Sequence, residues 1–131
     1  MIQEFVDAFM KNKKSCRTKL QERHPDDYQD IVRIVLETIN EKEDTLYRKP
    51  NSFRIHEIDD SEYQGVLLFI IPENIPQPVN YWAVKVLYGS CSASDVLQSI
   101  KDSCSAKTPT EEQLDEYMSL ALHTVQRIRT L

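Results

Sequence analysis

Gly65-Val66-Leu67-Leu68-Phe69-Ile70-Ile71 is the stretch that decides the fold of this 131-residue chain. Every residue after the glycine is apolar, so the stretch has no wet face, which is typical of a central strand covered on two sides. Residues 53–58 precede it with a partly alternating apolar and polar pattern, and residues 81–88 follow it with aromatic and β-branched side chains. Three consecutive strands with short to medium connections favour an antiparallel meander.

Helical periodicity surrounds these strands on the N-terminal side. Apolar residues recur at helical spacing over residues 2–10, with a weaker continuation to Leu20. Pro25 suits the first turn of a second helix, because its missing N–H has no helical partner there. The apolar stripe behind it predicts a helix that runs to about Lys42.

Two more helices are predicted after the strands. Ser92 is a candidate cap for a helix that starts near Ala93, and Thr108-Pro109-Thr110-Glu111 has the residue order of a helix start, with Thr108 as cap. The apolar stripe of the last helix extends to Ile128. The chain is therefore expected to be a single α+β domain over residues 1–131, a three-stranded antiparallel meander flanked by about four helices, two N-terminal and two C-terminal.

Composition limits the classes of function. The net charge of -5 argues against nucleic-acid binding, which normally needs a basic face. No stretch approaches the roughly 18 apolar residues of a membrane span, and acids stand at the N-terminus where a signal peptide carries bases. Three widely spaced cysteines, Cys16, Cys91 and Cys104, form no disulfide framework. A reducing cytoplasm is the expected compartment.

The clearest candidate site is the turn Tyr88-Gly89-Ser90-Cys91-Ser92-Ala93-Ser94-Asp95, where a predicted strand passes into a predicted helix. Free backbone N–H groups and the helix dipole at such a junction can hold an anion or stabilise a thiolate. Cys91 is thus either a packed small residue beside the cap or a ligand-contacting, reactive thiol. Nothing in the sequence places one of the three histidines beside it as a base.

Other constellations are weaker. His56 with Asp59, Asp60 and Glu62 has the residue types of metal binding or acid–base chemistry, but the spacing matches no ligand signature and a turn with a solvated strand edge is favoured. The aromatic residues Tyr63, Trp82 and Tyr88 are either core residues or a stacking platform for a base or nicotinamide. No catalytic signature, metal-ligand spacing or glycine-rich phosphate loop is complete, so no metal and no cofactor are expected.

Several segments together resemble a family of small uncharacterised proteins of bacteriophages and prophages. The similar segments are His24-Pro25-Asp26-Asp27-Tyr28, Arg54-Ile55-His56-Glu57-Ile58-Asp59-Asp60, Tyr63-Gln64-Gly65, Tyr88-Gly89-Ser90-Cys91-Ser92, Asp95 and Leu120-Ala121-Leu122-His123-Thr124-Val125-Gln126. Ser94 stands where many members have a second cysteine, which argues against a two-thiol redox or metal role. The resemblance implies a phage-type accessory protein in the host cytoplasm and no particular mechanism.

Accessory phage proteins of this size act mostly by stoichiometric binding, so the leading hypothesis is a non-enzymatic inhibitor-like protein that binds a host defence or regulatory protein. The alternatives are an anionic small-molecule binder using the 88–95 turn and a thiol-dependent enzyme centred on Cys91. A homodimer is left open, and no nucleic-acid or membrane partner is expected. The hypothetical ligand-binding set is His56, Asp59, Asp60, Tyr63, Gln64, Tyr88, Ser90, Cys91, Ser92 and Asp95.

Overall fold

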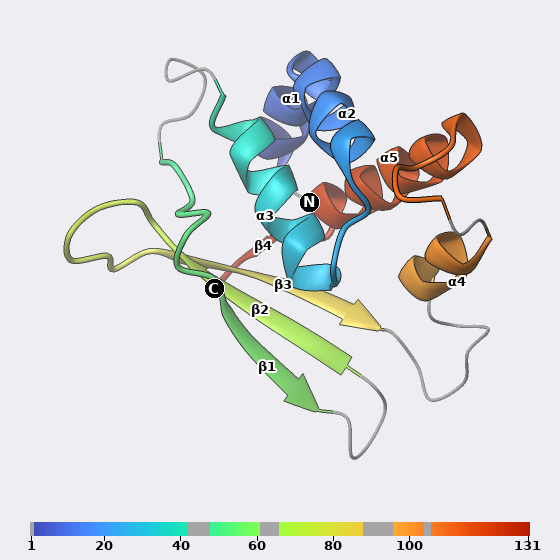
Figure 1. Ribbon diagram of the computed structural model, residues 1–131. Coiled ribbons are helices and arrows are strands. Elements are labelled where there is room, and N and C mark those ends of the chain that lie inside the picture. The colour runs from blue at the N-terminus through green and yellow to red at the C-terminus, as the bar shows by residue number, and fades with distance from the viewer. Residues whose placement is uncertain (1, 42–47, 61–65, 88–95, 104–105) are drawn as a thin grey trace.

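The computed structural model describes residues 2–41, 48–60, 66–87, 96–103 and 106–131. In this part of the chain, five helices and a four-stranded antiparallel sheet form an α+β fold (Figure 1). The elements in chain order are α1 (Gln3–Lys11), α2 (Lys13–Glu22), α3 (Tyr28–Ile39), β1 (His56–Asp60), β2 (Val66–Pro72), β3 (Tyr81–Leu87), α4 (Val96–Asp102), α5 (Glu111–Gln126) and β4 (Arg129–Thr130). The predicted fold class is confirmed.

The sheet has the order β1-β2-β3-β4, so the apolar strand β2 is central as predicted. It pairs antiparallel with β1 and β3, and Leu68 lies between Ile58 and Lys85 in the register. The short strand β4 was not predicted, because the last helical stripe was extended to Ile128. The helix ends at Gln126, Ile128 is fully buried, and the two residues after it pair with β3.

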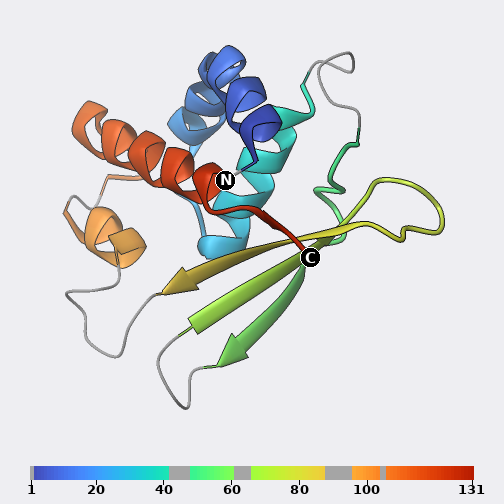
Figure 2. The same cartoon turned by 180° about the vertical axis from the view of Figure 1, so that it is seen from behind.

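All described helices lie on the same side of the sheet (Figures 1 and 2). Alternate residues of the central strand, Leu67, Phe69 and Ile71, point into the core between the two layers. Trp82 from β3 joins them and packs its ring against that of Phe5 from α1, with the ring centroids 5.3 Å apart. The interpretation of Trp82 as a core residue is therefore confirmed.

Two predicted helix starts are wrong by a few residues, in both cases because of side-chain capping. The N-cap of α3 is Asp27, whose carboxylate accepts the Asp30 N–H at 2.8 Å, so Pro25 precedes the helix. The N-cap of α5 is Thr110 and not Thr108. Gln113 completes a capping box by accepting the Thr110 N–H at 3.0 Å, and its buried amide donates to the Ile100 carbonyl.

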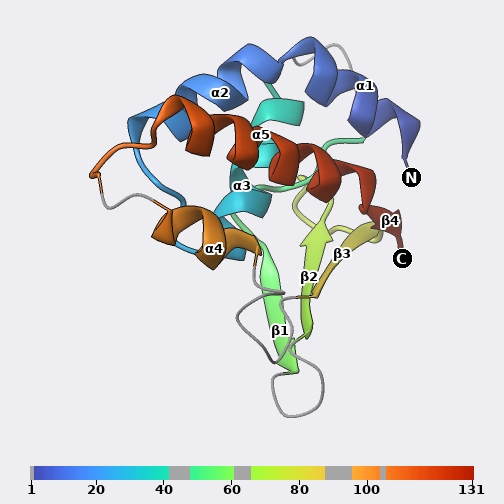
Figure 3. The same ribbon diagram turned by 90° about the vertical axis from the view of Figure 1, so that its right-hand side faces the viewer.

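The N-terminal pattern forms two helices instead of one. The chain breaks at Asn12, a buried residue whose side-chain amide donates to the Thr38 carbonyl at 3.1 Å and so ties the break to α3. Helix α3 ends at Ile39, earlier than predicted, and β1 starts at His56 instead of residue 53. Figure 3 shows the resulting arrangement, with the helices above and the sheet extending below them toward β1.

Candidate functional site

The candidate site is the face of the sheet turned away from the helices, which we name the open face. Successive residues of a strand point to opposite faces of the sheet. Every second described residue of three strands therefore contributes its side chain to the open face. These residues are His56 and Ile58 of β1, Val66, Leu68 and Ile70 of β2, and Tyr81, Ala83 and Lys85 of β3. In the register, Ile58, Leu68 and Lys85 form one row across the sheet, and His56, Ile70 and Ala83 form the next.

The open face is apolar at its centre. Val66, Leu68 and Ile70 remain partly exposed, and Ile58 is 45% exposed. Antiparallel sheets with one solvated face normally carry polar residues there. The run of β2 requires helices over at least one face, and this is confirmed, since alternate residues of β2 are buried under the helices. The further prediction of cover on both sides is wrong for the described part of the chain, since its helices cover one side (Figure 3). Contiguous exposed apolar patches on a protein surface are typical of interaction sites.

The connection from β2 to β3 extends the open face at one end. An open pocket of about 360 Å³ lies there, lined by Arg54, His56, Ile70, Pro72, Pro76, Pro78 and Tyr81. The Tyr81 hydroxyl donates to the Pro78 carbonyl at 3.1 Å, and the Asn80 amide donates to Glu73 at 2.8 Å. Proline backbones and these bonds stiffen the pocket wall. Val79, at the end of this connection, is 80% exposed.

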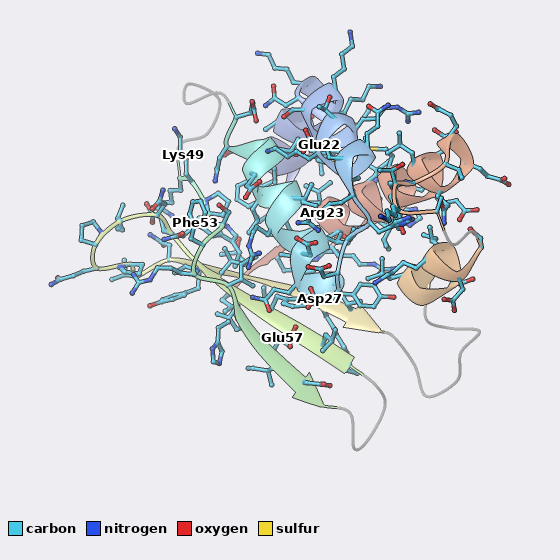
Figure 4. The ribbon with its side chains drawn as sticks, in the orientation of Figure 1. Glu22, Arg23, Asp27, Lys49, Phe53 and Glu57 are labelled. Atoms are coloured by element: carbon cyan, nitrogen blue, oxygen red, sulfur yellow. The ribbon has the colours of Figure 1, made fainter. Side chains whose placement is uncertain are left out.

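The described acidic side chains of β1 and the lysine of β3 lie on opposite faces of the sheet. Glu57 and Asp59 pair in the register with Phe69 and Leu67, which places both acids on the helix side. Glu57 lies below Asp27, at the start of α3 (Figure 4). Partial burial, followed by repulsion from Asp27 and Asp59, raises the pKa of the Glu57 carboxyl. The open face carries Lys85 and His56 instead, and among its described side chains there is no carboxylate.

The structure does not gather the predicted ligand set. His56 and Asp59 both lie on β1, but they point to opposite faces of the sheet. The backbone of Asp60 belongs to the same strand. The predictions for the Asp60 side chain and for Glu62, Tyr63, Gln64, Tyr88, Ser90, Cys91, Ser92 and Asp95 lie outside the described residues.

The apolar residues of the open face were not predicted as a site. The signal was present in the same stretch that decided the fold, because an apolar run at every position must place half of its side chains on the second face of the sheet. The run was interpreted as evidence for internal cover. Tyr81 and Lys85 carried no signal of their own, since one exposed tyrosine or lysine on a strand is ordinary.

A second concavity lies between α4 and α5. Its volume is about 610 Å³, and its lining residues are Ser99, Ile100, Asp115, Glu116, Ser119, Leu120, His123 and Arg127. This volume falls within the usual range of ligand pockets. The walls carry charges of both signs, with Asp115 also paired to Arg17 at 2.9 Å. The groove adjoins the helix that the 88–95 turn precedes in sequence.

The described residues contain no cluster of three or more His, Cys, Asp or Glu side chains placed to hold a metal ion. Cys16 is fully buried, and this burial raises the pKa of its thiol to about 11 despite a hydrogen bond with Thr38, so the thiol is unreactive at neutral pH. None of the described helices combines the length and the apolar content needed to cross a bilayer.

No protein-family model, curated protein or solved structure matches this chain. Function must therefore be inferred from the chemistry of the surfaces described above.

Proposed function

We propose that this chain is a non-enzymatic binding protein of the phage-accessory type, which acts stoichiometrically on a host protein through its open face. The observation that carries the proposal is the apolar, helix-free side of β2. Val66, Leu68 and Ile70 are held in a rigid sheet and remain partly exposed. Covering them would contribute about 0.8 kcal/mol for each CH₂ group removed from water.

The arrangement supports protein binding better than catalysis. The open face is broad and apolar, and its polar groups lie at the edges, as in protein interfaces with an apolar centre and a polar rim. Its described residues include no pair of a nucleophile and a base within hydrogen-bond reach. The rigid register of three paired strands fixes the side chains before a partner arrives, which lowers the entropic cost of association.

The test compares two substitutions at matched exposure. Ile58→Asp places a charge at the apolar centre of the open face, whereas Met10→Asp makes the same change on α1, at a residue that is 44% exposed. Tagged protein is used to capture a partner from bacterial host lysate, and the captured complex is quantified by titration. We expect Ile58→Asp to weaken partner binding at least about tenfold and Met10→Asp to leave it unchanged, with both variants folded by circular dichroism. Full retention of binding by Ile58→Asp would contradict the proposal.

A second candidate function, binding of an anionic small molecule, is favoured by the groove between α4 and α5. Arg127 and His123 lie one helical turn apart on its wall, where they could face an anion. Native mass spectrometry of protein purified from cells tests this candidate. The expected result is a bound mass that Arg127→Ala removes and Lys107→Ala retains. A bare polypeptide mass for the wild-type protein would count against it.

A further inference from the structure

Resting on the proposed function, we infer that the partner presents a segment that is both aliphatic and acidic. The apolar centre of the open face selects the aliphatic part. The cationic side chains around that centre favour acidic residues in the partner segment. They lie at the open face although the net charge of the whole chain is -5.

Two cationic side chains and a histidine lie beside the apolar rows. Lys85 is exposed and directly opposite Leu68, while Arg54 lines the pocket together with His56. Within the described part of the chain, none of these three side chains forms an ion pair. On the helical side, Arg17 and Arg23 are each paired with carboxylates. A partner carboxylate on the open face would therefore meet cations without displacing an internal pair.

The pocket at the end of the open face supplies the anchor point. Pro72, Pro76, Pro78 and Tyr81 make its wall apolar and stiff, and its volume of about 360 Å³ is sufficient for one large side chain. Arg54 contributes to the same lining. An aliphatic or aromatic anchor followed closely by Asp or Glu would satisfy both parts of this pocket, since a guanidinium pairs with a carboxylate in bidentate geometry.

Two other occupants fit less well. Single-stranded nucleic acid is bound on aromatic platforms, whereas the central positions of the open face are the aliphatic Val66, Leu68 and Ile70, with Tyr81 at one end. A second copy of the chain, docked face to face about a two-fold axis, would bring two sets of the same cations into one interface. An acidic protein segment complements both the apolar and the charged features.

The experiment selects peptides from a random 16-residue library displayed on yeast, with this protein as the bait. We expect enriched sequences that combine Leu, Ile, Val or Phe with Asp or Glu. Lys85→Glu and Arg54→Glu should each lower the affinity for the selected peptides at least about tenfold. This loss of affinity should grow as the salt concentration falls. Lys107→Glu, the same charge reversal at an exposed residue outside the open face, should leave their affinity unchanged.

The remaining outcomes separate this inference from the proposed function. The acidic partner would be contradicted, and the binding face retained, if the selected peptides lost affinity with Ile58→Asp but not with Lys85→Glu. Enrichment of peptides rich in Lys and Arg would lead to the same conclusion. Peptides indifferent to Ile58→Asp, or no enrichment at all, would overturn both. Two further assays, sedimentation equilibrium and titration with a labelled 20-nucleotide DNA strand, complete the test. A dimer that Ile58→Asp abolishes would show that a second copy of the chain occupies the open face. Tight DNA binding would show a nucleic acid as the occupant.

Discussion

Asp30 shows how a single buried carboxylate organises the N-terminal half of the helical layer. It is 5% exposed, and it accepts hydrogen bonds from the Arg23 guanidinium at 3.0 Å and from the Asp26 N–H at 2.9 Å. Burial alone would raise the pKa of this carboxyl. The hydrogen bonds and the charge of Arg23 outweigh that effect, so the pKa lies below its ordinary value.

We expect Asp30→Asn to lower the free energy of unfolding by about 2 kcal/mol at pH 7, since bonds to a charged group contribute roughly 1.5–3 kcal/mol. A lowered folded-state pKa means that the contribution is complete above the unfolded-state value of about 3.9. It is lost as the pH falls through the folded-state pKa. Urea titrations of both proteins at pH 7 and pH 3 measure the difference, which should shrink at pH 3. A constant difference would show that charge is not the cause.

The thiols provide a second prediction at the level of single residues. Cys16 has no exposed surface and its pKa is raised to about 11, so iodoacetamide should leave it unmodified in the folded protein at pH 8. Peptide mass spectrometry after alkylation across a pH series also reports on Cys91. A midpoint near 8.5 for Cys91 would dismiss the thiol-dependent enzyme, whereas a midpoint well below it would revive that hypothesis. Rapid labelling of Cys16 would contradict its burial.

At the level of elements, β1 is an edge strand whose acids suit a protective role. Exposed edge strands invite pairing with other chains, and charged side chains oppose this pairing. Glu57 and Asp59 lie on the same face of β1, and repulsion from Asp59 is one cause of the raised pKa of Glu57. Because that pKa is raised, removing the Glu57 charge should not reduce the stability of the monomer at pH 7.

The single substitution Glu57→Val is therefore expected to leave the thermal midpoint unchanged or slightly higher, and the double substitution Glu57→Val and Asp59→Val is expected to promote association. Sedimentation velocity at several protein concentrations measures the association. The control is Glu112→Val with Glu116→Val, which makes the same chemical change on the exposed surface of α5 and should remain monomeric. Equal association of both double variants would attribute the effect to lost charge alone.

Elements with a strong local signal could be predicted from the sequence. The strand β2 and the core of α3 were predicted, because a short unbroken apolar run after a glycine is typical of a strand and the apolar stripe of α3 has the helical period. Both misplaced helix starts have local caps, Asp27 bonding the Asp30 N–H and the box of Thr110 with Gln113, and in each case a proline nearby favoured an earlier start. Gln113 closes the box at Thr110 while also binding the Ile100 carbonyl, and no local pattern encodes that second partner. The strand β4 is too short to have a period at all.

On the scale of the whole molecule, the candidate site could be predicted only in part. Residues 66–71 predicted a strand with two apolar faces, and both faces of β2 are apolar in the structure. Whether the second face is covered by the same chain depends on how many helices pack on each side, and periodicity does not contain that information. The open face is uncovered by helices because all described helices pack on the other side of the sheet.

Contacts distant in sequence hold the helical layer together as one unit. His24, which follows α2, contacts the Tyr117 hydroxyl of α5 through Nδ1 at 2.7 Å and the Ala106 carbonyl through Nε2 at 2.9 Å. A carbonyl can only accept, so Nε2 carries the proton, and in the neutral ring the tyrosine donates to Nδ1. Burial, together with the nearby Glu116, raises the pKa of Tyr117 to about 12, which keeps the hydroxyl protonated.

Tyr117→Phe removes this hydroxyl and leaves His24 Nδ1 without its partner. We expect the free energy of unfolding to fall by about 1–2 kcal/mol, the range for a lost bond to a buried group, with a single cooperative transition retained. Tyr81→Phe is the matched control, because its hydroxyl bonds the Pro78 carbonyl on an exposed part of the sheet, and it should cost less than about 0.5 kcal/mol. Urea unfolding followed by both circular dichroism and tryptophan fluorescence measures these values. Two separate transitions in the wild-type protein would contradict the single domain, and equal losses in the two variants would contradict the special role of the His24–Tyr117 contact.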